Sequence, residues 1–93
     1  MIHVLLQITV ADFERFWSGF RTRGRPLRHG SKGARVFRHA DAPGKVTILF
    51  RWASRAHLER FLQDPEVRAS MTQGGTIGAP VITYLEQAGE LEA

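Results

Sequence analysis

The two halves of this 93-residue chain carry the same pattern of side chains, displaced by 42 positions so that Val4 corresponds to Val46. In each half, apolar residues alternate up to an Ala that is followed by a helix-capping residue, Asp12 or Ser54. The further matching pairs are Leu6 with Ile48, Ile8 with Phe50, Val10 with Trp52, Phe16 with Leu58 and Phe20 with Leu62. Alternation with a period of two is typical of a strand with one buried face. The pattern therefore predicts a duplicated strand–helix unit.

After each of the two capping residues, apolar side chains recur at the spacing of a helix. The first apolar stripe consists of Phe13, Phe16, Trp17 and Phe20, and the second of Leu58, Phe61 and Leu62. Gly24 and Pro26 should end the first helix, and residues 24–33 should form a loop. Asp64 and Pro65 should restart the second helix, which then runs to about Met71.

Four strands complete the expected pattern, at residues 1–10, 34–40, 45–52 and 81–86, with a turn at 41–44. The order β-α-β-β-α-β is that of the ferredoxin-like α+β fold. We expect residues 1–93 to form a single domain, in which two helices cover one face of a four-stranded antiparallel sheet.

The other face of this sheet should carry His3, Leu5, Gln7, Thr9, Thr47, Leu49 and Arg51, with Phe37 and His39, or Arg38, from the second strand. Such a face is too apolar at its centre for water and too polar for a dry core. We therefore expect a homodimer that packs sheet against sheet. The alternative is a monomer with a half-hydrated sheet face.

Composition narrows the function classes. The absence of Cys excludes disulfide scaffolds, thiolate metal sites and a Cys nucleophile. No apolar run approaches the ~20 residues that span a membrane, and residues 1–11 lack the marks of a signal peptide, so a cytoplasmic protein is expected.

The charged residues are unevenly distributed along the chain, whose net charge is +4. Residues 15–38 contain eight Arg or Lys and no Asp or Glu, whereas all the charged residues in 69–93 are Glu. This asymmetry indicates an anion-facing surface or subunits that dock through opposite charges.

Several segments together resemble the dimeric α+β barrel superfamily, close to the antibiotic-biosynthesis-monooxygenase-like and cyclase-like proteins. They are residues 10–13 (VADF), 33–38 (GARVFR), 41–43 (DAP), 50–52 (FRW) and 64–67 (DPEV), so the resemblance spans nearly the whole chain. It implies a cofactor-independent monooxygenase or cyclase that acts on an aromatic or polyketide-like substrate, in a cleft between sheet and helices. Haem-degrading members need an Asn on the first strand and a Trp and a His on the second helix. This chain has no Asn, and it has Phe61 and Met71 at the two helix positions.

The implied cleft assigns candidate substrate-binding residues, namely Trp17, Phe20, Trp52, Phe61, Met71, Thr76 and Tyr84. Plain core packing is the alternative for most of them. No cofactor or metal is expected, since the pairs His57/Glu59 and His39/Asp41 lack further ligands to close a site. The segment 74–78 (GGTIG) follows a helix rather than preceding one, so it is interpreted as a flap over the cleft or as an ordinary connector.

Cofactor-free oxygenation needs a base that removes a proton and a cation that stabilises the resulting oxyanion. The candidate bases are His29 and His39, with Arg28 or Arg38 as the cation. His3 is expected at the dimer interface, and His57 in solvent at the start of a helix.

Three hypotheses can be separated by structure. An enzyme requires a ligand-sized void with a His at its wall, and a cavity below roughly 100 Å³ would rule the enzyme out. A non-catalytic ligand-binding or stress-related protein of the same fold predicts a filled cleft without a titratable group. A nucleic-acid-binding protein predicts basic residues around exposed aromatics, which the first and third strands do not supply.

Overall fold

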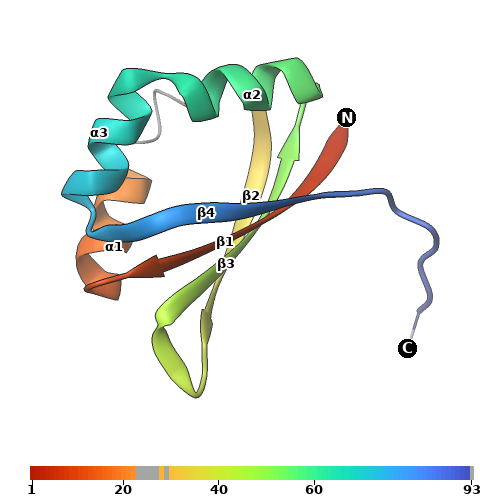
Figure 1. The fold of residues 1–93 in the computed structure, drawn as a ribbon. Coiled ribbons are helices and arrows are strands. Elements are labelled where there is room, and N and C mark those ends of the chain that lie inside the picture. Colours follow the sequence, from red (N-terminus) through yellow and green to blue (C-terminus); the bar gives the residue numbers. More distant parts are fainter. Residues whose placement is uncertain (23–27, 29, 93) are drawn as a thin grey trace.

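The helices and strands follow the expected order, with the second helix divided in two (Figure 1). A computed structural model describes residues 1–22, 28 and 30–92. Its elements are β1 (Ile2–Val10), α1 (Phe13–Arg21), β2 (Ser31–His39), β3 (Ala42–Trp52), α2 (Arg55–Gln63), α3 (Pro65–Gln73) and β4 (Thr76–Leu85). The strands form one antiparallel sheet in the order β2-β3-β1-β4, which confirms the ferredoxin-like α+β fold.

Capping side chains begin each helix where the sequence predicts. The Asp12 carboxylate accepts a hydrogen bond from the Arg15 amide, and the Ser54 hydroxyl accepts one from the His57 amide. Asp64 accepts from the Glu66 amide, and Pro65 follows it at the first position of α3, so the predicted break is confirmed. The expected end of the first helix at Gly24 and Pro26 lies outside the described residues.

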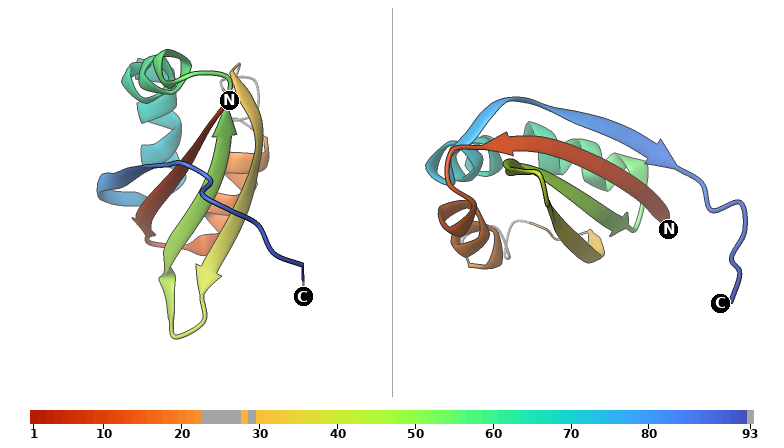
Figure 2. Two further views of the ribbon diagram at one scale, coloured as in Figure 1. Left: turned by 90° about the vertical axis from the view of Figure 1, so that its right-hand side faces the viewer. Right: turned by 90° about the horizontal axis from the view of Figure 1, so that it is seen from below.

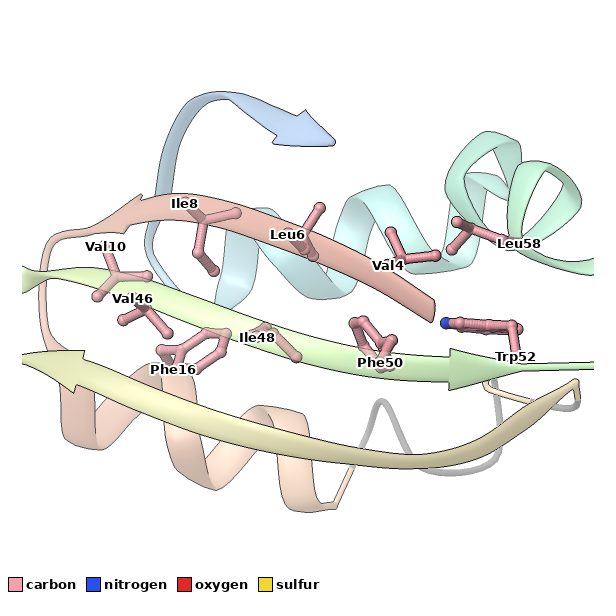
Figure 3. Close-up of a cluster of buried hydrophobic side chains, with 10 residues drawn as sticks. All are labelled: Val4, Leu6, Ile8, Val10, Phe16, Val46, Ile48, Phe50, Trp52 and Leu58. Carbon is pink, nitrogen blue, oxygen red and sulfur yellow. The ribbon is translucent and has the colours of Figure 1, made fainter. Parts of the chain in front are cut away.

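The core lies between the sheet and the helices. Figure 3 shows its ten buried side chains, which come from the alternating face of β1 and β3 and from the helices, namely Val4, Leu6, Ile8, Val10, Phe16, Val46, Ile48, Phe50, Trp52 and Leu58. Both halves of the 42-residue repeat thus meet in one core, because β1 and β3 are direct neighbours in the sheet. Val67 of α3 is buried as well.

Only one face of the sheet is covered. Figures 1 and 2 show the three helices gathered on one side, while the segment after β4 runs away from them. Five of the seven large hydrophobic residues exposed in the described chain lie on the strands, all on the open face, namely Phe37, Leu49, Ile77, Val81 and Leu85. This is the face that the sequence predicts to be too apolar for water.

Three strands are longer than the sequence predicts, and the predicted turn at 41–44 is wrong. His39 pairs with Ala42, so Ala40 and Asp41 make the turn and Pro43 and Gly44 belong to β3. β2 begins at Ser31 rather than at residue 34. β4 begins at Thr76 rather than at residue 81, although it contains Gly78 and Pro80.

The position of β4 explains how it tolerates these residues. The ladder with β1 is regular up to Gln7 and Val81, and it resumes at Thr9 and Ile77. Gly78, with a φ of +72°, lies in this irregular stretch of an edge strand, as does Pro80. A bulge on an edge accommodates both a positive φ and a missing amide hydrogen. The expected flap over residues 74–78 is therefore wrong, and Gly74 and Gly75 form an ordinary connector.

Truncation of a core Leu to Ala should lower the free energy of unfolding far more than the same truncation in the C-terminal segment. Leu58 is 1% exposed and Leu91 is 96% exposed. We expect Leu58→Ala to lower the free energy of unfolding by about 2–5 kcal/mol, because it leaves a cavity under α2. Leu91→Ala should change it by less than about 0.5 kcal/mol. Urea denaturation of both variants measures the difference, and similar losses would contradict this description of the core.

Candidate functional site

A small apolar cavity lies between the helices and the inner face of the sheet. Its volume is about 50 Å³, and most of its wall consists of aromatic and aliphatic side chains. Four predicted substrate-binding residues line it, namely Phe20, Phe61, Met71 and Thr76. These come from α1, α2, α3 and β4, so every helix contributes to the cavity. The volume is below the 100 Å³ limit, so the volume test goes against the enzyme hypothesis, and the cavity as it stands has no room for an aromatic substrate.

Three other predicted substrate-binding residues lie outside this wall. Trp52 is 1% exposed in the core, with its ring centroid 4.9 Å from that of Phe61, and its indole N–H has no hydrogen-bond partner among the described residues. The Tyr84 ring lies under the Arg55 guanidinium, 3.9 Å from its carbon. Trp17 faces an open groove on the other side of Phe20. Core packing therefore explains Trp52 better than substrate contact does.

The polar groups at the cavity wall are few, and they come from Arg28, Ser70 and Thr76. The Arg28 guanidinium donates a hydrogen bond to the Phe20 carbonyl at 2.7 Å, and it lies 4.2 Å from the centre of the Phe20 ring. The Thr76 hydroxyl is buried without a hydrogen-bond partner among the described residues. Among the described residues, Arg28 is thus the cation at the cavity wall. It is one of the two arginines that the sequence analysis named as the candidate cation.

Ser70 is a wall residue that the sequence analysis missed. It lies on α3 between Val67 and Gly74, and all three line the cavity at a helical spacing of three to four residues. The signal was present in the sequence. A search for apolar residues alone passes over it, because a small hydroxyl side chain can occupy the inward face of a helix.

The candidate pair His39 and Arg38 is divided by the sheet. The His39 ring lies on the open face, where its Nε2 is 2.8 Å from the Thr47 hydroxyl. Arg38 lies on the helical face, with its guanidinium 4.9 Å from the centre of the Phe13 ring. These two residues cannot act together on one ligand, because successive strand residues point to opposite faces. The other candidate base, His29, lies outside the described residues.

Three further observations concern other classes of function. In residues 1–22, 28 and 30–92, no group of three or more His, Asp or Glu is placed to hold a metal ion. Nor does that part of the chain contain a helix long and apolar enough to cross a membrane. On the open face, β1 and β3 carry no Phe, Tyr or Trp.

The sequence model of the antibiotic biosynthesis monooxygenase family matches residues 1–73. The chain belongs to this family. The match covers both halves of the repeat and all three helices, and it ends before β4. A search of curated protein sequences finds no match.

Solved structures of this family share the fold of the chain. A protein from Bordetella bronchiseptica named for the family superposes with a TM-score of 0.74 and 19% identity, over 94% of this chain and 96% of that one. SnoaB, a cofactor-independent oxygenase from Streptomyces nogalater, superposes with a TM-score of 0.70 and 16% sequence identity, over 94% of both chains. A protein from Caulobacter crescentus, also named for the family, superposes with a TM-score of 0.69 and 22% sequence identity, over 95% of this chain and 90% of that one.

The unpartnered hydroxyl at the cavity wall generates a stability prediction. Thr76→Val replaces a buried hydroxyl with a methyl group of similar size, and we expect the free energy of unfolding to rise by about 1 kcal/mol. Thr72→Val, on α3 and away from the open sheet face, should not raise it, because the Thr72 hydroxyl donates a hydrogen bond to the Arg68 carbonyl. Thermal denaturation followed by circular dichroism compares the two, and a loss of stability in Thr76→Val would show that the hydroxyl has a partner.

Proposed function

We propose that the protein binds an aromatic small molecule between its sheet and its helices. The observation that carries this proposal is the apolar cavity, which is walled by Phe20, Phe61 and Met71 and bordered, among the described residues, by the cation Arg28. Because the cavity holds only about 50 Å³, the ligand must displace part of the wall. Phe20, Phe61 and Met71 are half-buried, so their side chains can turn without breaking the core of β1 and β3.

We propose further that the protein oxygenates this ligand without a cofactor. The family and the likeness to SnoaB support this proposal. The substrate would carry a CH₂ group activated by a neighbouring carbonyl, and the reaction of CH₂ with O₂ would give C=O and H₂O. A base starts the reaction by removing a proton, and Arg28 at the wall would stabilise the enolate oxygen. His29 is the candidate base that remains for this site, since it is next to Arg28 in the sequence and His39 lies on the open face.

The second candidate function is ligand binding without catalysis. The small volume of the cavity favours it, and so does the wall, where no His is found among the described residues. The two candidates predict the same ligand class and differ only in whether the ligand is consumed.

Oxygen uptake separates these candidates. We expect the protein to consume O₂ with anthrone, an aromatic ketone with an activated CH₂ group. His29→Ala should lower the rate by about 100-fold, which is the contribution of a general base. His39→Ala is the matched control and should leave the rate unchanged. Anthrone binding without O₂ uptake would support the second candidate, and equal rates in the two variants would remove His29 from the mechanism.

We also propose that the protein is a homodimer that packs through the open sheet face. Leu49 supports this proposal, since it lies opposite Leu5 on the central strands and is exposed in the single chain. The exposed side chains of Phe37 on β2 and Val81 on β4 extend the apolar surface to both edges of the sheet. A second copy of the same face would remove this surface from water.

A charge at the centre of this face should separate the subunits. We expect Leu49→Glu to reduce the mass in solution from twice the 10.5 kDa chain mass to once that mass, because a dry interface cannot accept an unpaired carboxylate. Leu91→Glu, in the exposed C-terminal segment, should remain dimeric. Light scattering on a sizing column measures both, and a wild-type monomer would refute the proposal.

A further inference from the structure

A second hollow adjoins the cavity on the far side of Phe20. It is an open groove of about 810 Å³ between the C-terminal end of α1 and the first half of β2. This volume is in the range of pockets that hold drug-sized ligands. The groove is therefore large enough for a ligand that the cavity of about 50 Å³ cannot contain.

Phe20 and Arg28 line both hollows and so form the wall between them. The Phe20 ring is half-buried, and on the groove side it stacks against Trp17, with centroids 6.3 Å apart and an interplanar angle of 18°. Arg28 lies against the same Phe20 ring. The two hollows are therefore neighbours, and the side chains of Phe20 and Arg28 lie between them.

The mouth of the groove is strongly basic. Arg21, Arg28 and Lys32 line it, and no Asp or Glu is found among its described lining residues. Arg55 and Glu59 form the one ion pair found among the described residues. Neither Arg21 nor Lys32 therefore has a described carboxylate within 4.0 Å. Arg21 lies over the Trp17 ring at 5.3 Å, so a cation and an aromatic surface are already placed together. The groove thus offers positive charge beside an apolar wall.

We propose that groove and cavity form one binding site for a planar aromatic anion. The ring enters past Phe20 towards Phe61, and the carboxylate or other acidic group stays at the mouth with Arg21 and Lys32. This inference rests on the proposed function, to which it adds the charge of the ligand. It also gives a role to three basic residues of the segment 15–38, namely Arg21, Arg28 and Lys32.

A small anion fits these observations better than a nucleic acid does. Among the described residues, the aromatic side chains that line the groove are Trp17 and Phe20, and Phe20 also lines the cavity. A site for single-stranded nucleic acid needs a row of stacking residues along a basic track. The two ligand classes are separated by the experiment below.

The test uses 2-naphthoate and its neutral counterpart, 2-naphthalenemethanol, with tryptophan fluorescence as the readout. The chain has two Trp, of which Trp52 is in the core, so Trp17→Phe shows whether the signal comes from the groove. We expect the double variant Arg21→Gln, Lys32→Gln to bind 2-naphthoate about tenfold more weakly, as expected for the loss of two partly exposed ion pairs. Its affinity for the neutral alcohol should change less than twofold.

The matched control is Lys45→Gln, Arg60→Gln, which removes two exposed charges away from the groove. It should bind both compounds as the wild type does. Equal losses in the two double variants would mean that net charge and not this groove attracts the anion, which would overturn the inference. Binding of the alcohol but not of the acid would also overturn it, while the proposed binding function would stand.

Phe20→Ala tests the connection between the two hollows. Removal of the ring should open the cavity to the groove, and the variant should bind the larger 2-anthracenecarboxylate at least as tightly as it binds 2-naphthoate. A preference unchanged from the wild type would contradict the common site. Binding of a short oligonucleotide that outcompetes 2-naphthoate would identify the groove as a nucleic-acid surface and overturn the proposal. Circular dichroism confirms that each variant is folded.

Discussion

Burial of the alternating face of β1 and β3 is the interaction on which the rest of this structure depends. Val4, Leu6 and Ile8 on one strand meet Phe50, Ile48 and Val46 on the other, residue opposite residue. Both strands are central in the sheet, so each helix must pack against this same surface to bury its own apolar stripe. The cavity arises where the helices do not completely fill the space above these strands.

The sheet has apolar residues on both faces, whereas the helices cover one. Within the described residues, no helix or strand lies over Leu5 and Leu49. The proposed dimer resolves this imbalance without changing the core. It also leaves the groove between α1 and β2 outside the sheet-to-sheet contact, because the groove residues Trp17 and Phe20 belong to the helical layer.

Period-two alternation and capping residues allowed the sequence to predict the strand order, the core and the break at Asp64. The strand ends could not be predicted in this way, because Pro43, Gly78 and Pro80 are typical of loops and occur here in edge or irregular parts of the ladder. For the site, the family resemblance assigned seven residues to a cleft, of which Phe20, Phe61, Met71 and Thr76 line the cavity, while Trp17, Trp52 and Tyr84 do not. The volume of the cavity could not be predicted, since it depends on the distances between elements. The division of Arg38 from His39 follows from alternation alone, and it could have been predicted.

The irregular stretch of β4 also affects how copies of this chain can associate. An edge strand with free amide and carbonyl groups invites another strand to extend the sheet, which leads to open-ended aggregation. Pro80 has no amide hydrogen to offer, and the positive φ of Gly78 bends the strand out of a flat ladder. The strand that exposes Val81 and Leu85 to the proposed face-to-face contact thus also carries a barrier to growth along the edge.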